Sequence, residues 1–509
     1  MKKASITIYL SLMLVLIVTV ISASIVSVKV QAGRSRVANG VDQAMFSLFA
    51  QYDRDLLEKY DVFFIDGAVG SGKMQIGAIY DRFESALEYI LKPNKGSILG
   101  GRNLLSLSLA EGAVTGYTLA TDACGEIYAS QAVDYMKETA GIQGVSLLLG
   151  KYGNAASAVE TNNTEADVLE SLSGGITYSD LEAESEEAKR ADAEEAAALE
   201  EEGIYGPTEA EARAEAVPDD FVNPLPFISE LRSRAVLDLV VGGDGNISEK
   251  TLDGLSLASS KAANTGIGVI DVPEGIGTFE SHLLYDEYIL THFGSYTAPR
   301  SEDVLSYQAE YILQGKGSDR ENLEEMVTKL LAIREAANIV YLYTDPAKTE
   351  ELEAASGAIA ALLFIPLAEP VIKALLAAGW AFCESLVDVR GLLHGRRVPV
   401  MKSGTTWQVS LAGIPSLLED GGLDAAGRDD GDGMSYQDYL RIFLVLADSR
   451  TQITRSLDMV EANIRKSGRD GFRINCCIES LTVEVNVRSE NRVTLTEEQT
   501  ARYRDFVKS

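Results

Sequence analysis

An uncharged and strongly apolar stretch at the N-terminus constrains this chain more than any other feature. It runs from Ala4 to Val28, which is 25 residues without one charged side chain. As an α-helix, a segment of this length would be about 37 Å long, enough to cross the hydrocarbon core of a bilayer. We therefore expect residues 4–28 to lie in the lipid bilayer as a transmembrane helix.

Charged residues on the two sides of this stretch bear on its orientation. Lys2 and Lys3 precede it, and so short a basic leader favours an N-terminus that stays in the cytoplasm. Basic residues also follow the stretch, at positions 29, 34 and 36, so the charges alone leave the orientation open. We expect a single-pass protein of the cell membrane, with a cytoplasmic N-terminus and an extracytoplasmic C-terminal domain.

A cleaved signal peptide is the alternative to an anchor over residues 1–33. Val30-Gln31-Ala32, which stands before Gly33, resembles a small-residue cleavage site. However, the apolar stretch is longer than the apolar core of a usual signal peptide, and this length favours a retained anchor. Both interpretations carry the rest of the chain out of the cytoplasm.

The helical pattern continues beyond the apolar stretch, over residues 34–60, as a stalk. Apolar side chains recur at steps of three and four residues, and charged residues lie off this stripe. The apolar positions are Val37, Val41, Ala44, Leu48, Tyr52 and Leu56. Gly33 and Gly40 are candidates for a bend near the bilayer surface. An apolar helix that continues as a stalk into a globular head is the layout of pilin-like proteins.

The remaining sequence predicts a helix-rich α+β head. Residues 61–155 mix strand-like and helical patterns, and residues 221–509 contain several apolar helices and an alternating strand at 481–487. Residues 156–220 form an acidic insert rich in alanine and glutamate. Within it, segment 181–202 carries ten acidic and two basic residues, which predicts a solvated helix or a disordered segment.

Charge and composition exclude several classes of partner and site. The net charge of −31, without a basic stripe, makes nucleic acid an improbable partner because phosphate backbones repel it. The three histidines do not have the spacing of zinc ligands, so we expect neither a metal nor another cofactor. The cysteines are too few for a disulfide scaffold. Two disulfide pairs are arithmetically possible, but the small number of cysteines favours the interpretation that they are buried free thiols. They are Cys124, Cys383, Cys476 and Cys477.

Residues Gly67–Lys73 match the glycine-rich loop that cradles nucleotide phosphates. Met74, however, replaces the hydroxyl residue that should bind magnesium. The segment is also expected outside the cytoplasm, where nucleotides are scarce. We therefore interpret it as a flexible turn.

Residues 428–433 resemble a calcium loop. Asp430 and Asp432 occupy two liganding positions, but Arg428 and Tyr439 stand where the first and last carboxylates belong. These replacements exclude a regular EF-hand. A surface loop is favoured, and a weak cation site near Asp430 and Asp432 stays open as the alternative.

Four polar residues in two apolar helices form the candidate site. Glu384 and Asp388 share one helix face, and Arg334 and Asn338 share a face of another helix. Paired carboxylates can act as acid and base, but charges within apolar helices are more often paired with one another. We therefore expect Arg334 or Arg390 to contact one of the carboxylates in a structural polar network, and we nominate no catalytic residue.

Several segments outside the acidic insert share a resemblance to one known family. They are Gly40 through Leu48 with Tyr60–Phe64, Glu310–Lys316, Ile333–Glu335 with Asn338, Trp380–Ser385 with Asp388–Arg390, and Ser435–Leu440. They resemble an uncharacterised family of Gram-positive, mainly clostridial, membrane proteins, which are encoded among tight-adherence (Flp-type) pilus genes. These proteins look like TadE/TadG minor pseudopilins.

The resemblance implies a minor pilus-assembly or envelope component, with other pilin-like or envelope proteins as partners. It brings no catalytic residue or cofactor. Tyr9 stands where the glutamate of a typical prepilin peptidase site belongs, which favours an unprocessed anchor. We thus expect an anchored structural or assembly protein rather than an enzyme. The alternative is an anchored extracytoplasmic enzyme or ligand-binding protein that uses an acidic site within residues 221–509.

Overall fold

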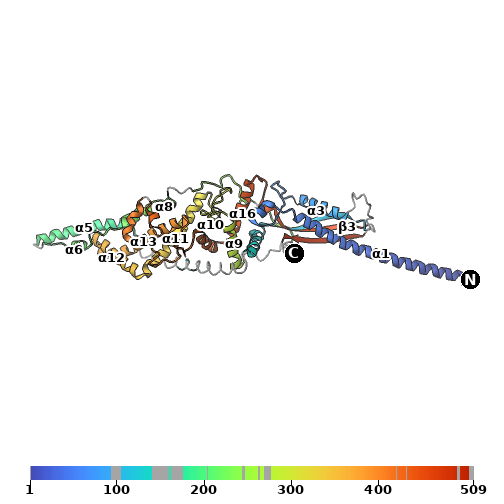
Figure 1. Ribbon diagram of the computed structural model, residues 1–509, viewed down its shortest axis with the longest axis horizontal. Helices are drawn as coiled ribbons and strands as arrows, with labels where there is room; N and C mark the ends of the chain where they lie inside the picture. Colours follow the sequence, from blue (N-terminus) through green and yellow to red (C-terminus); the bar gives the residue numbers. More distant parts are fainter. Residues whose placement is uncertain are drawn as a thin grey trace. The chain divides into compact units, whose positions relative to one another are not determined.

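The computed structural model has an α+β fold that is rich in helices and contains a small antiparallel sheet, as the sequence predicts (Figure 1). It describes residues 2–92, 105–139, 157, 159, 161, 176–202, 205–242, 247–261, 264–268, 277–419, 421–431, 433–489 and 493–503. The chain forms two compact units. Unit 1 contains Met1–Thr139, Leu255–Ser281 and Ile453–Ser509, and unit 2 contains Ala140–Gly254 and His282–Gln452.

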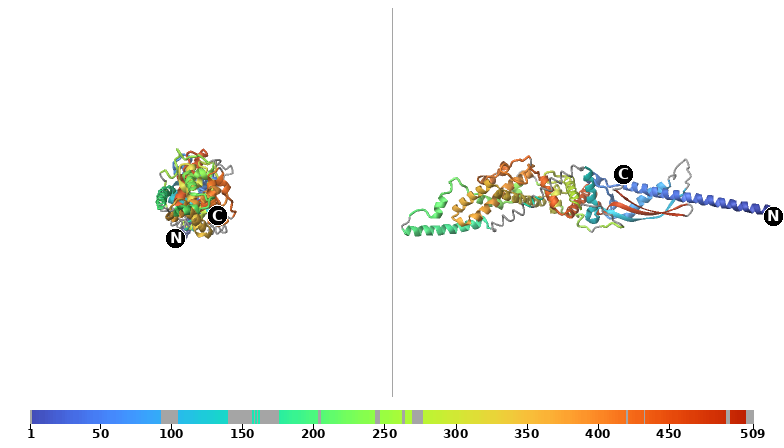
Figure 2. Two further views of the ribbon diagram at one scale, coloured as in Figure 1. Left: turned by 90° about the vertical axis from the view of Figure 1, so that its left-hand side faces the viewer. Right: turned by 90° about the horizontal axis from the view of Figure 1, so that it is seen from below.

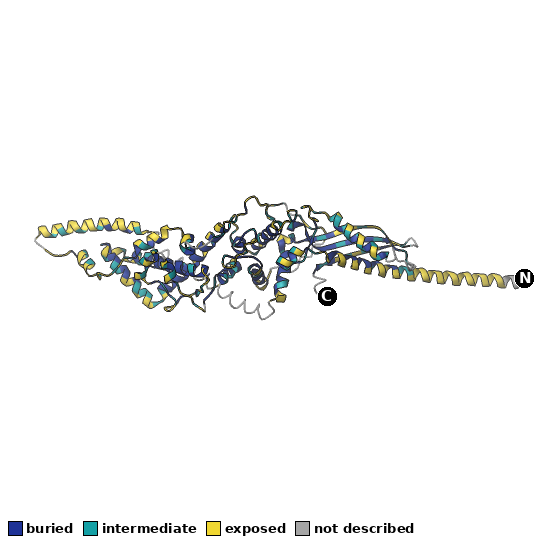
Figure 3. Cartoon of the chain, turned by 45° about the horizontal axis from the view of Figure 1, so that its top comes forward, coloured by how far each residue is buried: buried dark blue, intermediate teal, exposed yellow. Residues whose placement is uncertain are grey.

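Helix α1 (Lys2–Phe49) is one uninterrupted helix of 48 residues. Its N-terminal part projects beyond the sheet of unit 1 (Figures 1 and 2), and its apolar side chains are exposed (Figure 3). Two helical stretches of the described residues are long and apolar enough to cross a membrane, namely Ile6–Phe49 and Pro366–Leu393. The first has no buried share in its most apolar window, whereas the second is mostly buried within unit 2.

The C-terminal part of α1 belongs to the core of unit 1. Val37, Val41, Ala44 and Leu48 are buried, which confirms these four positions of the predicted stripe. They pack in one cluster with α3 (Ile76–Leu91) and the sheet. The two parts of α1 thus have different surroundings. The apolar side chains of the first part are exposed, whereas those of the second part are buried against the rest of unit 1.

The two glycines of α1 are packing positions and not bends. A Cβ at Gly33 would lie 3.1 Å from Leu495 Cδ1, and one at Gly40 would lie 3.4 Å from Leu87 Cδ1. The expected bend is therefore wrong for these residues, since their small size lets α1 approach its neighbours.

The predicted helical stalk over residues 34–60 also needs a correction, because it contains two helices. Helix α1 ends at Phe49, and α2 (Arg54–Tyr60) begins after it. The side chain of Asp53 caps α2 by accepting hydrogen bonds from the backbone N–H groups of Asp55 and Leu56.

Strand β3 is the centre of the sheet and pairs antiparallel with each of the other strands. The strands are β1 (Ile65–Asp66), β2 (Ser108–Leu119), β3 (Cys477–Arg488) and β4 (Thr494–Arg502). The predicted alternation over 481–487 is confirmed, since its four apolar side chains are buried. Strand β4 had no equally clear pattern in the sequence, and its presence follows from pairing with β3.

This pairing corrects the predicted domain over residues 221–509. Strand β3 pairs with β2, which lies more than 350 positions earlier in the chain. Residues 453–509 therefore belong to unit 1, and residues 282–452 belong to unit 2. Local periodicity identifies a strand but carries no information about which distant strand will pair with it.

Helices dominate unit 2. They include α7 (Leu225–Ser233), α8 (Val236–Val241), α10 (Gln308–Gln314), α11 (Asp319–Thr344), α12 (Pro346–Leu362), α13 (Glu369–Leu393), α14 (Gly422–Ala426) and α15 (Tyr436–Leu446). The chain crosses the boundary between the units within α9 (Phe279–His292) and α16 (Ser449–Lys466).

The apolar pattern over 228–241 predicts a single helix, but the backbone leaves the helical conformation between Ser233 and Val236. Helix α13 packs against both α11 and α12 and is buried over most of its length.

The acidic insert contains two helices, α5 (Tyr178–Glu201) and α6 (Glu209–Glu215). Of the two predicted alternatives for segment 181–202, the solvated helix is therefore the one that the chain adopts. Thr177 and Asp180 form a capping box at the start of α5. Leu181 and Ser185 are buried, whereas most other positions of the helix are exposed (Figure 3).

The turn that resembles a phosphate loop uses its backbone amides internally. The Asp66 carboxylate accepts hydrogen bonds from Ala68 N at 2.9 Å and from Gly70 N at 3.1 Å. The negative charge of this carboxylate would repel a phosphate at the same amides, which agrees with the interpretation as a turn.

The four cysteines are free thiols, of which Cys124 is exposed and the others are buried.

The packing of α1 predicts that a new carboxylate destabilises unit 1 far more on the buried side of this helix than on its exposed side. Val41→Asp should lower the free energy of unfolding of unit 1 by more than about 3 kcal/mol, because it buries an unpaired charge. Asn39→Asp, on the exposed side of the same helix, should change it by less than about 0.5 kcal/mol. Limited proteolysis and thermal unfolding of the detergent-solubilised chain measure both. Equal effects of the two substitutions would contradict the packing.

Candidate functional site

The candidate site is a group of buried charged and polar side chains between α11 and α13. Helix α11 carries Arg334 and Asn338, and α13 carries Glu384 and Asp388. In each helix the two residues are four positions apart, so they face the same side. Lys402 enters the group from the loop after α13. We refer to these five residues as the buried network.

Arg334 joins three segments of unit 2. Its Nε and one terminal nitrogen donate to Asp388 Oδ2 at 3.1 and 2.9 Å. Its other terminal nitrogen donates to the carbonyl oxygens of Pro399 and Val400 at 2.8 and 2.9 Å and to the Tyr439 hydroxyl at 2.9 Å. The guanidinium therefore links α11 to α13, to the loop after α13 and to α15.

Lys402 bridges the two carboxylates. Its ammonium nitrogen lies 2.5 Å from Glu384 Oε1 and 2.7 Å from Asp388 Oδ1, and it also donates to the carbonyl oxygen of Thr406 at 3.1 Å. Glu384 accepts further hydrogen bonds from the backbone N–H groups of Gln408 and Val409. With two cations and two carboxylates, the buried network is formally neutral.

The two carboxylates respond differently to their surroundings. Burial raises the pKa of Asp388, but Arg334 and Lys402 outweigh burial, and the net shift is downward. Burial also raises the pKa of Glu384. Lys402 lowers it, but the negative charge of Asp388 adds to the effect of burial, and the net shift of the pKa is upward. Asp388 is therefore the carboxylate that the buried network holds most firmly in its charged form.

Both tryptophans of the chain lie beside the buried network. The indole N–H groups of Trp380 and Trp407 donate to one carbonyl oxygen, that of Val409, at 2.8 and 2.6 Å. The Lys348 ammonium lies 4.4 Å from the ring centre of Trp380, which is a cation–π distance. Since Val409 also donates to Glu384, tryptophan fluorescence is expected to report on this site.

The structure brings together four of the five residues that the sequence singled out. Arg334, Asn338, Glu384 and Asp388 meet, and Arg334 makes the predicted contact with a carboxylate. Arg390 does not join them. Its Nε donates to Asp424 Oδ1 of α14 at 2.6 Å, because residue 390 is two positions from 388 and faces another side of α13.

Sequence reasoning missed Lys402. It lies in a loop, where no periodic pattern indicates which way a side chain points. The available signal was a charge imbalance, since two carboxylates on one apolar helix face outnumber the single arginine expected to pair with them.

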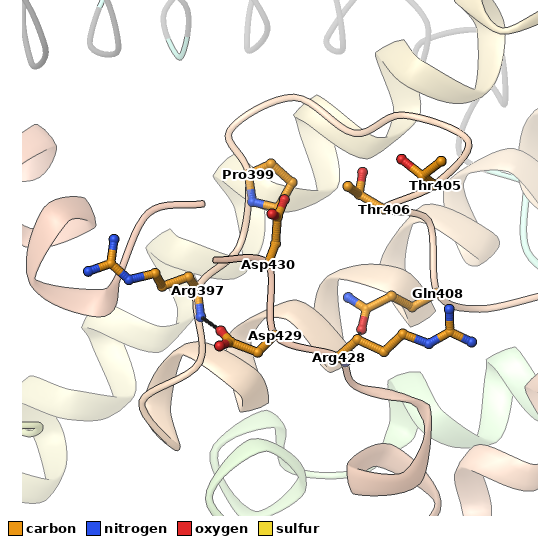
Figure 4. Close-up of a pocket in the computed structure, with 8 residues that line it drawn as sticks. All are labelled: Arg397, Pro399, Thr405, Thr406, Gln408, Arg428, Asp429 and Asp430. Carbon is orange, nitrogen blue, oxygen red and sulfur yellow. Dashed lines mark hydrogen bonds between the residues drawn. The ribbon is translucent and has the colours of Figure 1, made fainter. Parts of the chain in front are cut away.

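A cavity of about 260 Å³ lies next to the buried network (Figure 4). Its lining is Arg397, Pro399, Thr405, Thr406, Gln408, Arg428, Asp429 and Asp430. Gln408 connects the two sites, since its side-chain nitrogen donates to Asp388 Oδ1 at 3.2 Å. The guanidinium groups of Arg397 and Arg428 point away from each other in Figure 4, so they do not form a clamp for one anion.

The cavity also contains part of the sequence that resembles a calcium loop. Asp430 lines it, whereas Asp432 lies outside the described residues. Asp429 Oδ1 accepts a hydrogen bond from Arg397 N at 2.7 Å. Among the residues that the structure describes, no group of three potential ligands has the geometry to hold a metal ion.

Glu310 of α10 is a second buried carboxylate in unit 2. Its Oε1 accepts hydrogen bonds from Tyr296 N at 2.8 Å and from the Tyr436 hydroxyl at 2.9 Å. Its Oε2 is buried and has no hydrogen-bond partner in the described part of the chain. Burial raises the pKa of Glu310 to about 7. It therefore titrates near neutral pH.

A family model matches residues 214–489, which is more than half of the chain. The chain belongs to DUF5702, a family of unknown function. The DUF5702 segment includes the entire buried network and strand β3, while α1, β2 and α5 lie before it. No curated protein and no solved structure matches the chain.

Removal of the bridging lysine should destabilise this DUF5702 protein strongly. Lys402→Met should lower the free energy of unfolding by about 3–5 kcal/mol, because two buried carboxylates would share one cation. Lys373→Met, which breaks the partly exposed pair with Glu353, should cost less than about 1 kcal/mol. Denaturant unfolding followed by tryptophan fluorescence measures both variants. Similar losses would show that the buried network is not the determinant of stability.

Glu310 should make stability depend on pH between about 4.5 and 7. Its folded pKa is above its ordinary value of 4.5, so its contribution is present at low pH and is lost as the pH rises through about 7. Between pH 5 and pH 8 this loss should be about 2 kcal/mol. Glu310→Gln should remove that component in urea titrations at the two pH values. An unchanged pH dependence in the variant would be the contrary result.

Proposed function

We propose that this protein is a single-pass membrane protein whose C-terminal part lies outside the cytoplasm, where it acts as a structural or assembly component. We further propose that it is a pseudopilin-like component of a pilus or of the cell envelope. One observation carries the proposal. The apolar and core-packed parts of α1 form a single helix, so a membrane anchor would continue directly into the head.

The exposed part of α1 is favourable only where something covers it. Leu10, Leu12 and Leu14 are each more than 60% exposed, as are several neighbours, and lipid would remove this surface from water. Further along the helix, Val41 and Leu48 are buried in the core of unit 1. Such a continuous helix would fix the position of unit 1 relative to the bilayer surface, which suits a scaffold.

The buried network supports a structural role more than a catalytic one. Glu384 and Asp388 are held by Lys402, Arg334 and backbone amides, so their hydrogen-bonding capacity is used within the protein. A general acid or base must reach the proton that it transfers. The alternative of an enzyme or a ligand-binding protein would instead need a carboxylate that is not held in this way.

Deletion of residues 1–28 tests the anchor. The full chain should stay in the membrane fraction after a carbonate wash, and the shortened chain should become soluble with the same thermal unfolding as the intact head. The cut leaves Val30 and Gly33, which pack against the core, in place. Recovery of a mature protein that begins at Gly33 would contradict a retained anchor and support a cleaved signal peptide.

The exposed Cys124 tests the orientation. In intact spheroplasts, a membrane-impermeant maleimide should label the full chain but not Cys124→Ser, because the other three thiols are buried. Labelling that requires lysis of the spheroplasts would contradict an extracytoplasmic head. For the assembly role, normal filaments and a normal envelope in a strain without the protein would be the contrary outcome.

A further inference from the structure

The turn between α12 and α13 exposes apolar side chains at one end of unit 2. We call residues 362–368 the α12–α13 tip. Leu367 is 96% exposed and Leu362 is 37% exposed. Phe364 has a φ of 62°, in the left-handed region that a bulky residue rarely adopts. Strained apolar turns of this kind are often found where a protein binds another molecule.

A groove beside the tip is large enough to accept an apolar side chain. It measures about 280 Å³ and lies between α12 and α6, which pack against each other (Figure 1). Small residues make the space. The lining is Ala210, Arg213, Gly357, Ala360, Ala361, Phe364, Pro366 and Glu369. Phe364 and Pro366 of the tip line the groove, so the tip and the groove adjoin each other and form one surface.

Acidic helices border this surface. Helix α5 carries ten acidic and two basic residues, and α6 carries three acidic residues and one basic residue. Tyr178, Glu182 and Glu186 of α5 line a second cavity with Leu363 of the tip. The hydroxyl of Ser185, which also lines that cavity, is buried and has no hydrogen-bond partner among the residues that the structure describes.

We propose that the α12–α13 tip binds a basic amphipathic helix of another protein. The apolar face of that helix would cover Leu362 and Leu367 and place one side chain in the groove, and its lysine or arginine side chains would face α5 and α6. The negative potential of these helices selects for a cationic partner and opposes nucleic acid and anionic lipid. This interaction is independent of the anchor and of the pilus role.

Binding of designed peptides to the full chain in phosphatidylcholine nanodiscs tests the proposal. The probe is a fluorescently labelled leucine–lysine peptide with one apolar helical face. Two comparison peptides keep either the apolar face with glutamate in place of lysine, or the composition in a shuffled order. Fluorescence anisotropy, corrected for empty nanodiscs, should show that the first peptide binds at least about tenfold more tightly than the others.

Substitutions in the protein locate the binding surface. Leu367→Asp should weaken binding of the leucine–lysine peptide about tenfold, and Glu182→Gln with Glu186→Gln should weaken it about threefold at low salt. Leu446→Asp is the matched control, because Leu446 is an exposed leucine elsewhere in unit 2. Thermal unfolding of each variant should match that of the unaltered chain.

Three results would overturn the proposal. They are equal binding of the glutamate or shuffled peptide, equal loss of binding in Leu367→Asp and Leu446→Asp, and no binding above empty nanodiscs. Co-purification of the chain with the nanodiscs is measured before each titration, so that a failure of the anchor is distinguished from a failure of the tip to bind the peptide.

Discussion

A carboxylate can be buried in the centre of a helix only if cations and hydrogen-bond donors replace the water that it loses. Asp388 meets this requirement through Arg334 and Lys402, and it thereby joins α11, α13 and the loop that follows α13. The same guanidinium holds two carbonyl groups of that loop and the Tyr439 hydroxyl of α15. Much of the arrangement of unit 2 around α13 thus depends on the neutrality of one buried group of charges.

The tryptophans extend the effect of this group to the apolar core. Val409 donates its amide to Glu384 and accepts both indole N–H groups at its carbonyl oxygen. The backbone of Val409 therefore contacts both the buried network and the two tryptophans. A network with this many satisfied donors and acceptors specifies a unique arrangement of its helices, because alternative packings would leave charges without partners.

In unit 1, the corresponding constraint is the continuity of α1. The residues that pack against α3 and the sheet belong to the same helix as the exposed apolar residues, and Gly33 and Gly40 permit the close contacts without interrupting it. In the proposed role as an anchor, this helix would carry the head at a fixed distance from the bilayer. In unit 2, the acidic helices and the α12–α13 tip form a surface of a different character, which the proposed cationic partner would cover.

Several features of this protein can be read from local sequence. The absence of charge over residues 4–28 determines a long apolar helix, the alternation over 481–487 determines a strand with one buried face, and the spacing of Glu384 and Asp388 determines that both face one way. These predictions succeed because helix and strand geometry relate near neighbours through fixed periods.

Only the tertiary structure decided which distant segments meet. Local sequence patterns do not predict these contacts. Examples are the pairing of β3 with β2, the position of Lys402 between two carboxylates, and the ion pair of Arg390 with Asp424. The physical reason is that pairing energy depends on position in space, and the chain brings these groups together only when its helices and strands pack around a common core.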